Sequence, residues 1–447
     1  MTEVATGEAT ELLQQLIRNR CVNDGTPDSG NEDRQVATLR SYLDVTGAEI
    51  QTFNKRPGRG NLVLRIEGSD RTAPALLLMG HTDVVPANPE GWQRDPFGGE
   101  LVDGEVWGRG AVDMLNITAT MAVAAKHLLR DGFRPRGTLI YMGVADEEAE
   151  GTFGAKFMTE EHWDAVAAQN VITENGGVRL DLPGDPDDLR LNLTVGEKGT
   201  QWVKLRVRGT PGHGSAPYAS DNAVVKAARI AARVAAYQPP PTLHELWRRY
   251  IQAMRFPTEL AGALSDARTL DAVLPTLPLG LAKLVHASTR NTFSPNVLRG
   301  GSKVNVIADE ALLEIDIRTL PETSRDDVRA MLKDAIGDLW PEVEILYESD
   351  NVSTASVVDT PLRDVLERVT RSLVPKARVV PVLTVGATDN RFFRRKGAVA
   401  YGYGLMSPEL PMSQFRSMFH GRDERVHVES LRLSTELWVR TAREFLA

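Results

Sequence analysis

The chain has 447 residues, which is more than one ordinary hydrophobic core accommodates and enough for two or three domains. Its 42% hydrophobic and 25% charged residues are typical of a soluble globular protein. The formal net charge of -8 and the lack of a long basic run exclude the electrostatic pattern of a nucleic-acid-binding protein.

A single cysteine, Cys21, excludes an internal disulfide framework and a Cys-rich zinc site. We interpret it as a packed helix residue rather than a nucleophile. Residues 1–8 lack the basic and apolar regions of a signal peptide, and no apolar run approaches the length of a membrane span. We therefore expect a cytoplasmic protein that has no nucleic-acid or membrane partner.

The first part of the chain alternates helices and strands, which indicates an α/β sheet. Apolar residues at helical spacing predict helices over residues 9–20 and 32–45. Short apolar runs predict strands over residues 61–66 and 75–79.

His81 and Asp83 follow the second of these strands. In an extended chain, positions i and i+2 point the same way, so both side chains can serve one point at the carboxyl edge of the sheet. A neutral imidazole there can bind a metal ion, and the Asp can accept the other ring N–H and fix the tautomer. His-x-Asp also occurs by chance in many loops, so this prediction depends on the residues that follow.

A glycine-rich segment from Gly104 to Met114 precedes a helix predicted over residues 117–130. Its glycines would let the backbone bend closely around a site. Asp113, near the end of this segment, is either a site residue or only a residue at the start of the helix, for which Asn116 is the expected N-cap.

Two further predicted strands end in acids. Residues 137–144 run into Asp146-Glu147-Glu148, and residues 171–173 run into Glu174 and two glycines. A run of acids is usually a solvated loop, but here buried strands deliver the acids to the same sheet edge as His81. Several strands that each end in a His or a carboxylate are the arrangement expected of a metal site built on strand ends.

The pattern changes after a Pro- and Asp-rich segment at residues 182–188, which we interpret as a domain boundary. Half-exposed strands are predicted over residues 200–208, 304–319 and 343–347, and helices over residues 221–235 and 324–336. This order predicts a small α+β domain of ferredoxin-like type. Residues 238–290 read as an irregular insertion with a few helical turns. His213 lies in a Gly-rich loop, where a solvated residue is the alternative interpretation.

The last part of the chain returns to the first style. We expect a helix over residues 360–373, a polar turn over 386–393, a strand over 398–404 and a final helix over 430–445. His420 lies in the loop before that final helix.

The candidate ligands are two histidines and several carboxylates, all at strand ends or in Gly-rich turns: His81, Asp113, Glu147, Glu148, Glu174 and His420. This set suits Zn²⁺, with Mn²⁺ and Co²⁺ as plausible substitutes. A carboxylate that bridges two ions, with a His and a carboxylate on each, forms a two-metal hydrolytic site. One carboxylate must stay off the metals to take a proton from water, and the adjacent pair Glu147 and Glu148 offers that.

At this point the chain resembles the M20 metallopeptidases, the group of aminoacylase, carboxypeptidase S-like enzymes and succinyl-diaminopimelate desuccinylase. The matching motifs occur in the family's order: Gly80-His81-Thr82-Asp83-Val84-Val85-Pro86, Gly108-Arg109-Gly110-Ala111-Val112-Asp113-Met114, Asp146-Glu147-Glu148, Thr173-Glu174, Gly212-His213-Gly214-Ser215, Asn305-Val306-Ile307, Asp316-Ile317-Arg318, Ala387-Thr388-Asp389-Asn390-Arg391 and His420-Gly421-Arg422-Asp423-Glu424-Arg425. One departure is Leu115-Asn116, where the family often has Lys-Gly.

The resemblance implies a role for each site residue. Asp113 would bridge two zinc ions, with His81 and Glu174 on one ion, and Glu148 and His420 on the other. Asp83 would orient His81, and Glu147 would be the general base and then the general acid. His213 would help to stabilise the oxyanion, and in dimeric relatives it does so in the partner's site. Asn305, Arg318 and Arg391 are candidates for holding the substrate's carbonyl and carboxylate.

The resemblance also implies a discontinuous catalytic domain formed by residues 1–194 and 354–447. This domain would have the zinc-exopeptidase-like α/β fold, a mixed sheet flanked by helices. Residues 195–353 would form an inserted ferredoxin-like lid, through which the chain could form a homodimer. The insertion at residues 238–290 could equally cover the edge strand of the lid, so its role stays open.

We therefore expect a hydrolase with two Zn²⁺ per chain, or Co²⁺ or Mn²⁺, that cleaves an amide bond of small peptides or N-acyl amino acids. In the family, a Glu at the position of Glu174 goes with carboxypeptidases, dipeptidases and deacylases. A deacylase of the succinyl-diaminopimelate desuccinylase type is the alternative. A relative that binds metal without catalysis is a third interpretation.

Overall fold

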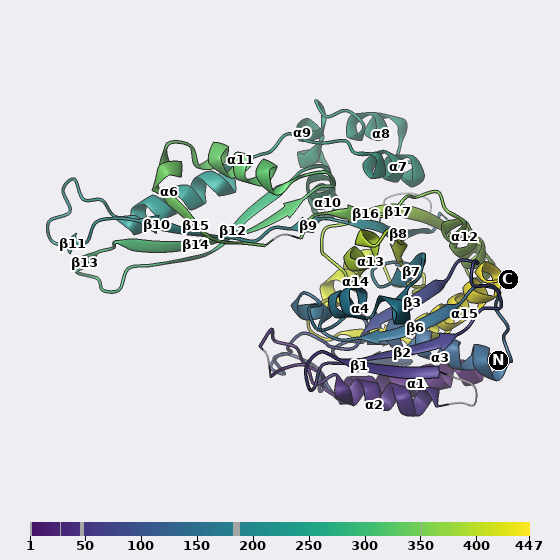
Figure 1. Ribbon diagram of the computed structural model, residues 1–447. Helices are drawn as coiled ribbons and strands as arrows, with labels where there is room; N and C mark the ends of the chain where they lie inside the picture. The colour runs from purple at the N-terminus through teal and green to yellow at the C-terminus, as the bar shows by residue number, and fades with distance from the viewer. Residues whose placement is uncertain (1, 27, 45–48, 182–187, 350) are drawn as a thin grey trace. The chain divides into compact units, whose positions relative to one another are not determined.

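The computed structural model describes residues 2–26, 28–44, 49–181, 188–349 and 351–447 (Figure 1). The chain divides into two compact units. Unit 1 comprises Met1–Val195, Ser356–Val382 and Thr388–Ala447, and unit 2 comprises Gly196–Ala355 and Leu383–Ala387. Nearly all of the segment predicted as a boundary, residues 182–187, lies outside the described residues. The catalytic and lid roles expected of the two parts stay predictions here.

Unit 1 is built on a mixed sheet whose central strands are parallel. Neighbouring strands follow the order β1-β2-β6-β3-β7-β18-β8, and β17 also pairs with β8. The pairs of β3 with β6 and β7, and of β18 with β7, are parallel, whereas β1, β2 and β6 pair antiparallel. The strands are β1 Glu49–Asn54, β2 Gly60–Ile66, β3 Leu76–His81, β6 Leu139–Val144, β7 Asn170–Thr173, β8 Arg190–Glu197, β17 Arg378–Thr384 and β18 Val399–Gly402.

Helices cover both faces of this sheet (Figure 1). On one face lie α1 Thr2–Arg18, α2 Asp33–Leu43, α3 Leu115–Arg130, α12 Pro361–Leu373 and α15 Val428–Phe445. On the other face lie α4 Ala155–Glu161, α5 Trp163–Val166 and α13 Asn390–Arg395. A further helix, α14, and a three-stranded sheet complete the unit: α14 Met412–Met418, β4 Glu100–Val102, β5 Glu105–Trp107 and β19 Arg425–His427.

The central strands are mostly apolar because both of their faces are covered. All six residues of β3 and of β6 are buried, as expected for parallel strands between two helical layers. Alternate residues serve opposite layers. Met79 and Met142 join the core that includes α4 and α13, whereas the hydroxyl of Tyr141 donates a hydrogen bond to the carbonyl of Thr118 in α3. This packing fixes the strand ends that carry the candidate ligands.

Unit 2 contains an antiparallel sheet in the order β12-β14-β10-β15, with β9 also paired to β14. Its core lies between the sheet and two helices, α6 and α11. The elements are β9 Gly199–Thr200, β10 Val203–Arg208, α6 Ala223–Ala236, β12 Thr292–Gly300, β14 Glu310–Thr319, α11 Arg325–Ile336, η3 Gly337–Glu342 and β15 Val343–Glu348. Three short strands complete the unit: β11 Gly212–His213, β13 Val306–Ile307 and β16 Thr354–Ala355.

The insertion at residues 238–290 is more helical than the sequence predicts. It contains α7 Glu245–Met254, α8 Thr258–Leu264, α9 Leu270–Val273, η2 Leu274–Thr276 and α10 Leu279–Thr289. Pro257 and Pro278 stand at the N-caps of α8 and α10. These two prolines therefore stand at the starts of short helices, where a missing backbone N–H costs nothing.

Several local predictions were wrong or incomplete. Strand β12 was missed because Pro295 and Asn296 suggest a loop, yet β12 is an edge strand with a bulge after Pro295. Helix α3 begins at Leu115 with Met114 at its N-cap and no side-chain cap, so Asn116 does not cap it. Cys21 is buried but lies beyond the end of α1. Of the helices in the described ranges, none has the length and hydropathy that crossing a membrane requires.

Candidate metal centre

Three candidate ligands meet at the carboxyl edge of the sheet in unit 1. His81 ends β3, Glu174 follows the neighbouring strand β7, and Asp113 lies two residues before the start of α3. Nε2 of His81 lies 3.2 Å from Oδ1 of Asp113 and 3.8 Å from Oε2 of Glu174. All three residues are buried, and one ligand atom from each lies within 4.8 Å of the others. Their spacing allows a single metal ion to contact all three.

A second group shares Asp113 with the first. Nε2 of His420 lies 2.9 Å from Oδ2 of Asp113 and 3.3 Å from Oε2 of Glu148. Glu148 lies in the single turn η1 Glu147–Ala149, which follows β6, and His420 lies between α14 and β19. The two oxygens of Asp113 therefore face different histidines. This is the arrangement of a carboxylate that can bridge two cations.

Burial and mutual hydrogen bonds shift the pKa values of the candidate ligands. Burial raises the pKa of Glu148 and the pKa of Glu174. Burial also acts to raise the pKa of Asp113, but hydrogen bonds with His420 and His81 lower it below its usual range. The hydrogen bonds of His420 with Asp113 and Glu148 raise the pKa of this imidazole to about 10.

Two carboxylate oxygens of the site lack hydrogen-bond partners among the described residues. They are Oε1 of Glu148 and Oε2 of Glu174, and both are buried. Burying an uncompensated carboxylate is costly, so carboxylates placed in this way fit a divalent cation. Imidazole nitrogens and carboxylate oxygens are ligands of Zn²⁺, Co²⁺ and Mn²⁺, so the residues present fit such ions.

Asp83 supports both His81 and the turn that carries Glu147 and Glu148. The ring Nδ1 of His81 lies 3.0 Å from the backbone carbonyl of Asp83 and 3.6 Å from its carboxylate. That carboxylate accepts hydrogen bonds from the backbone N–H groups of Glu147 at 3.2 Å and Glu148 at 3.1 Å. The backbone carbonyl is thus the closer acceptor for the imidazole, and the carboxylate holds the neighbouring turn in place.

Glu147 is the residue that the sequence predicts to be the general base. Within the described ranges its carboxylate has no hydrogen bond or ion pair. Burial raises the pKa of Glu147, His81 and Arg391 act to lower it, and Asp389 and Glu148 raise it further. A carboxylate with a raised pKa and no fixed partner, next to a candidate metal ligand, suits a general base.

A buried ionic cluster beneath this turn escaped the sequence analysis. Asn23 donates to the carboxylates of Asp83 at 2.8 Å and Asp146 at 3.1 Å. Arg59, which is 1% exposed, pairs with Asp146 and with Glu32 at 3.0 Å. Asp146 was visible only as one more acid in a run. Nothing local marks Asn23, Glu32 or Arg59, because their partners come from distant parts of the chain.

The other predicted site residues are placed differently. His213 and Asn305 are exposed in unit 2, where Nδ1 of His213 lies 2.7 Å from the hydroxyl of Ser215. Arg318 is partly buried and donates to Asp316 at 2.8 Å. Arg391 belongs to unit 1, is 5% exposed, and donates to the backbone carbonyls of Thr388 and Glu150. The roles expected of these four residues stay predictions.

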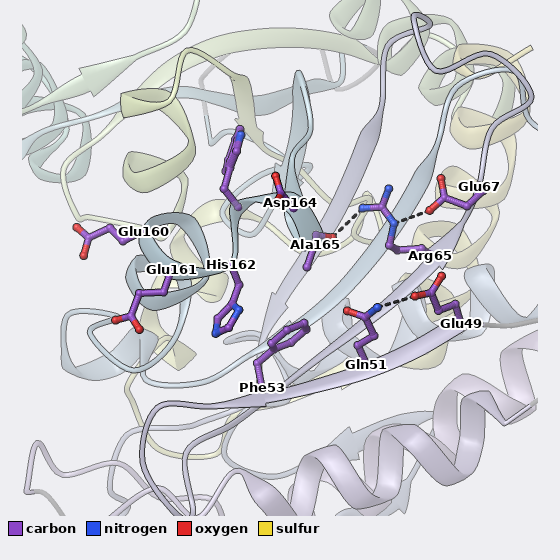
Figure 2. Close-up of a pocket in the computed structure, with 11 residues that line it drawn as sticks. Glu49, Gln51, Phe53, Arg65, Glu67, Glu160, Glu161, His162, Asp164 and Ala165 are labelled. Atoms are coloured by element: carbon purple, nitrogen blue, oxygen red, sulfur yellow. Dashed lines mark hydrogen bonds and ion pairs between the residues drawn. The ribbon is translucent and has the colours of Figure 1, made fainter.

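A separate concave surface lies over β1, β2 and the residues around α5 (Figure 2). Its volume is about 610 Å³. In Figure 2 Arg65 lies between Glu67 and the carbonyl of Ala165, and the ring of Phe53 lies beside His162. None of the candidate metal ligands lines this surface. It is therefore not part of the candidate metal centre.

Comparison with known proteins adds to this geometry. The model of peptidase family M20/M25/M40 matches residues 77–444. The N-fatty-acyl-amino acid synthase/hydrolase PM20D1 of Xenopus tropicalis is 25% identical over 454 residues, covering 98% of this chain and 86% of that protein. A succinyl-diaminopimelate desuccinylase of Gluconacetobacter diazotrophicus is 33% identical over 227 residues, covering 49% of this chain and 54% of that protein.

A solved structure shares the fold. The M20 family metallo-carboxypeptidase Sso-CP2 of Sulfolobus solfataricus superposes with a TM-score of 0.74 and 18% identity. The superposition covers 98% of this chain and 99% of that chain. The mixed α/β architecture is therefore that of a known metallopeptidase structure.

Proposed function

Because the chain belongs to peptidase family M20/M25/M40, we propose that it binds two divalent cations and hydrolyses an amide bond of a small peptide or an N-acyl amino acid. The chain is thus an enzyme of a hydrolase family, and the finer assignment is our proposal. The observation that carries it is the shared carboxylate: Oδ1 of Asp113 faces His81, and Oδ2 faces His420.

The proposed cations are two Zn²⁺, with Co²⁺ or Mn²⁺ as substitutes. His81, Asp113 and Glu174 would hold one ion, and Asp113, Glu148 and His420 the other. Bound there, the ions would supply Lewis-acid activation of water and of the substrate carbonyl. The surrounding protein would hold the ligand side chains in fixed positions around the ions.

Glu147 is the proposed general base. It would take a proton from the attacking water and then give it to the leaving amine, so that the amide becomes a carboxylic acid and an amine. Its adjacency to Glu148 supports this division of roles, because neighbouring side chains can serve different partners. Asp83 would act as a positioning residue, since its carboxylate holds the backbone of both glutamates.

The remaining roles are proposals that rest on the sequence motifs. His213 would stabilise the developing negative charge on the carbonyl oxygen. Asn305 and Arg318 would hold the substrate carbonyl and carboxylate, together with Arg391. The two terminal nitrogens of Arg391 already bind backbone carbonyls, so any contact it makes with a substrate would add to those bonds.

For the substrate class, we favour an N-acyl amino acid or a short peptide. The similarity to the N-fatty-acyl-amino acid synthase/hydrolase extends over 98% of this chain, which supports the N-acyl amino acid side of the proposal. The second candidate is a deacylase of desuccinylase type. It is supported by 33% identity, but over only 49% of this chain. The third hypothesis is that the chain binds metal ions without catalysing a reaction.

Unit 2 is proposed to be an inserted, ferredoxin-like lid, in agreement with the antiparallel sheet and two helices of that unit. A homodimer through this unit is a further proposal. Sedimentation that finds an active monomer at working concentration would reject it. The cytoplasmic location expected from the sequence stays a prediction, which cell fractionation tests.

The proposed activity is tested with the purified full chain, stripped by a chelator and reloaded with Zn²⁺ or Co²⁺. Three substrate sets are compared: N-acyl amino acids with short and long acyl chains, dipeptides with free or blocked N-termini, and N-succinyl-diaminopimelate. The expected result is metal-dependent cleavage of the first or second set, with no cleavage in the chelated control.

The other outcomes separate the alternatives. Preference for N-succinyl-diaminopimelate would replace our substrate assignment with the desuccinylase alternative. Two bound ions without cleavage of any set would favour the non-catalytic reading. Failure to bind any ion would reject the two-cation proposal itself.

A further inference from the structure

Glu424 is a buried residue close to the candidate metal centre, and it is not one of the candidate ligands. It lies four residues after His420 and is 0% exposed. Its Oε1 accepts hydrogen bonds from the backbone N–H groups of Gly110 at 3.1 Å, Val112 at 2.8 Å and Asp113 at 3.1 Å. The left-handed φ of +92° at Gly110 helps to turn these N–H groups toward one point, as in an anion-binding backbone nest.

Arg109 links the same carboxylate to the loop of His420. Its Nη1 donates to Oε2 of Glu424 at 2.6 Å, and its Nη2 donates to the carbonyl of Gly421 at 2.9 Å. The side chain of Arg109 is 3% exposed. The charges of this pair cancel, so it contacts both loops without adding net charge to a site that is already acidic.

The two segments do not need this pair in order to stay together. Strand β19 pairs antiparallel with β5, in a register that opposes Arg425 and Trp107. A second ion pair, between Arg425 and Glu105 at 3.0 Å, crosses the same strands and is partly exposed. Strand pairing and this outer ion pair therefore also join the segments, so their loss can be compared with loss of the buried pair.

The buried pair contacts the backbone beside two candidate ligands. Glu424 holds the backbone N–H of Asp113, and Arg109 holds the carbonyl next to His420. Those two ligands come from segments about 300 residues apart, yet their side-chain atoms lie 2.9 Å apart. We propose that Glu424 and Arg109 are positioning residues that set the geometry of Asp113 and His420 for the cation of the second group. This inference rests on the proposed two-cation function.

The test measures cation binding by the full chain rather than turnover alone. Apo protein is titrated with Zn²⁺ against a chromophoric chelator and with Co²⁺ by its visible absorption, which reports ligand geometry. The first variant is Glu424→Gln, which removes the negative charge. The second is Arg109→Lys, which keeps the positive charge but cannot contact Glu424 and Gly421 through two nitrogens at once. Glu105→Gln is the matched control, because it removes the outer ion pair between the same strands.

We expect Glu424→Gln and Arg109→Lys to weaken binding of one of the two ions by about 10- to 100-fold and to alter the Co²⁺ spectrum. Glu105→Gln should leave both readouts unchanged. Wild-type affinities and spectra in both folded variants, checked by circular dichroism, would overturn the inference. If Glu424→Gln does not fold, Arg109→Lys decides.

The wild-type chain reports separately on the proposed function. Two ions per wild-type chain with unchanged binding in the variants would reject the positioning role and leave the two-cation proposal standing. A wild-type chain that binds no ion would reject both, because no cation would then be positioned. Loss of one ion in the variants without any hydrolysis by the wild type would support the positioning role and remove the catalytic proposal.

Discussion

The candidate residues of unit 1 are held very differently from those of unit 2. His81, Asp113 and Glu174 are buried and lie close together at the carboxyl edge of the sheet. His213 and Asn305 are exposed, and they lie in or next to the short strands β11 and β13, which pair through only two residues each. The first set is arranged by the folded chain itself, whereas the second set has few contacts that fix it.

The two sets of residues also differ in the free energy that the fold spends on burying them. Burial raises the pKa of Glu148 and the pKa of Glu174, so ionising these carboxylates in unit 1 costs free energy that the proposed cations would offset. The side chain of His213 costs the fold almost nothing, because water solvates it. The candidate site residues of unit 1 should therefore affect both stability and catalysis, and the exposed candidate residues of unit 2 should affect catalysis alone. Four predictions test this contrast, in order of decreasing effect.

Glu147→Gln should have the largest effect, because it removes the proposed base while keeping the size of the side chain. We expect kcat/KM to fall by about 10⁴-fold, the upper end for a general base, which corresponds to about 5.5 kcal/mol. The variant should still bind two ions per chain, as measured by atomic absorption. Activity within about tenfold of wild type would refute the assignment of the base.

Arg59→Met should destabilise unit 1 by about 3–5 kcal/mol, because it leaves Glu32 and Asp146 buried without their cation. Urea unfolding followed by circular dichroism measures this change. Adding Glu32→Gln to the variant should restore part of the loss, since one buried charge is then removed. If the single variant is as stable as wild type, the cluster does not support the turn.

His213→Ala should lower kcat by about 10²- to 10³-fold, equivalent to about 2.7–4 kcal/mol, if His213 stabilises the oxyanion. The free energy of unfolding should change by less than about 0.5 kcal/mol, because the side chain is exposed. Ser215→Ala is the control, since it removes only the hydrogen-bond partner of the ring. Recovery of activity on mixing His213→Ala with Glu147→Gln chains would place His213 in the partner's site, and no recovery would place it in its own.

Lys204→Met should have the smallest effect. It breaks an ion pair with Glu314 at 3.3 Å on the sheet of unit 2, where both side chains are more than a third exposed. The expected loss of stability is about 0.2–1 kcal/mol, and it should shrink further at high salt. Thermal unfolding at two salt concentrations measures it. A loss comparable to that of Arg59→Met would erase the contrast between the two units.

Sequence patterns were sufficient to place the candidate ligands on strand ends, and the structure brings five of them together. His81 and Glu174 could be found because apolar runs, which are easy to recognise, deliver them to one edge. Glu148 follows another such run, and Asp113 and His420 lie in glycine-containing turns. The local signals for these residues are strong because each depends on a few neighbouring positions.

The supporting residues could not be predicted in the same way. Asn23 and Arg59 contact Asp146 across 123 and 87 residues, and no local pattern encodes such a partner. Glu424 was visible only as one letter of a motif, since its partners, three backbone N–H groups and the side chain of Arg109, lie more than 300 residues earlier in the chain. The edge strand β12 was missed for a different reason, because its proline and exposed residues carry the composition of a loop.

The sharing of Asp113 has a consequence for how the chain would take up cations. A first ion that withdraws electron density from one oxygen changes the charge available at the other. In the proposed two-cation site, the two uptake steps would be thermodynamically linked, and the two affinities would belong to the pair of ions rather than to either ligand group. At low free metal, a preparation would accordingly contain chains with no ion, one ion and two ions. The fraction of chains with two ions would differ from the value expected if the two ions bound independently.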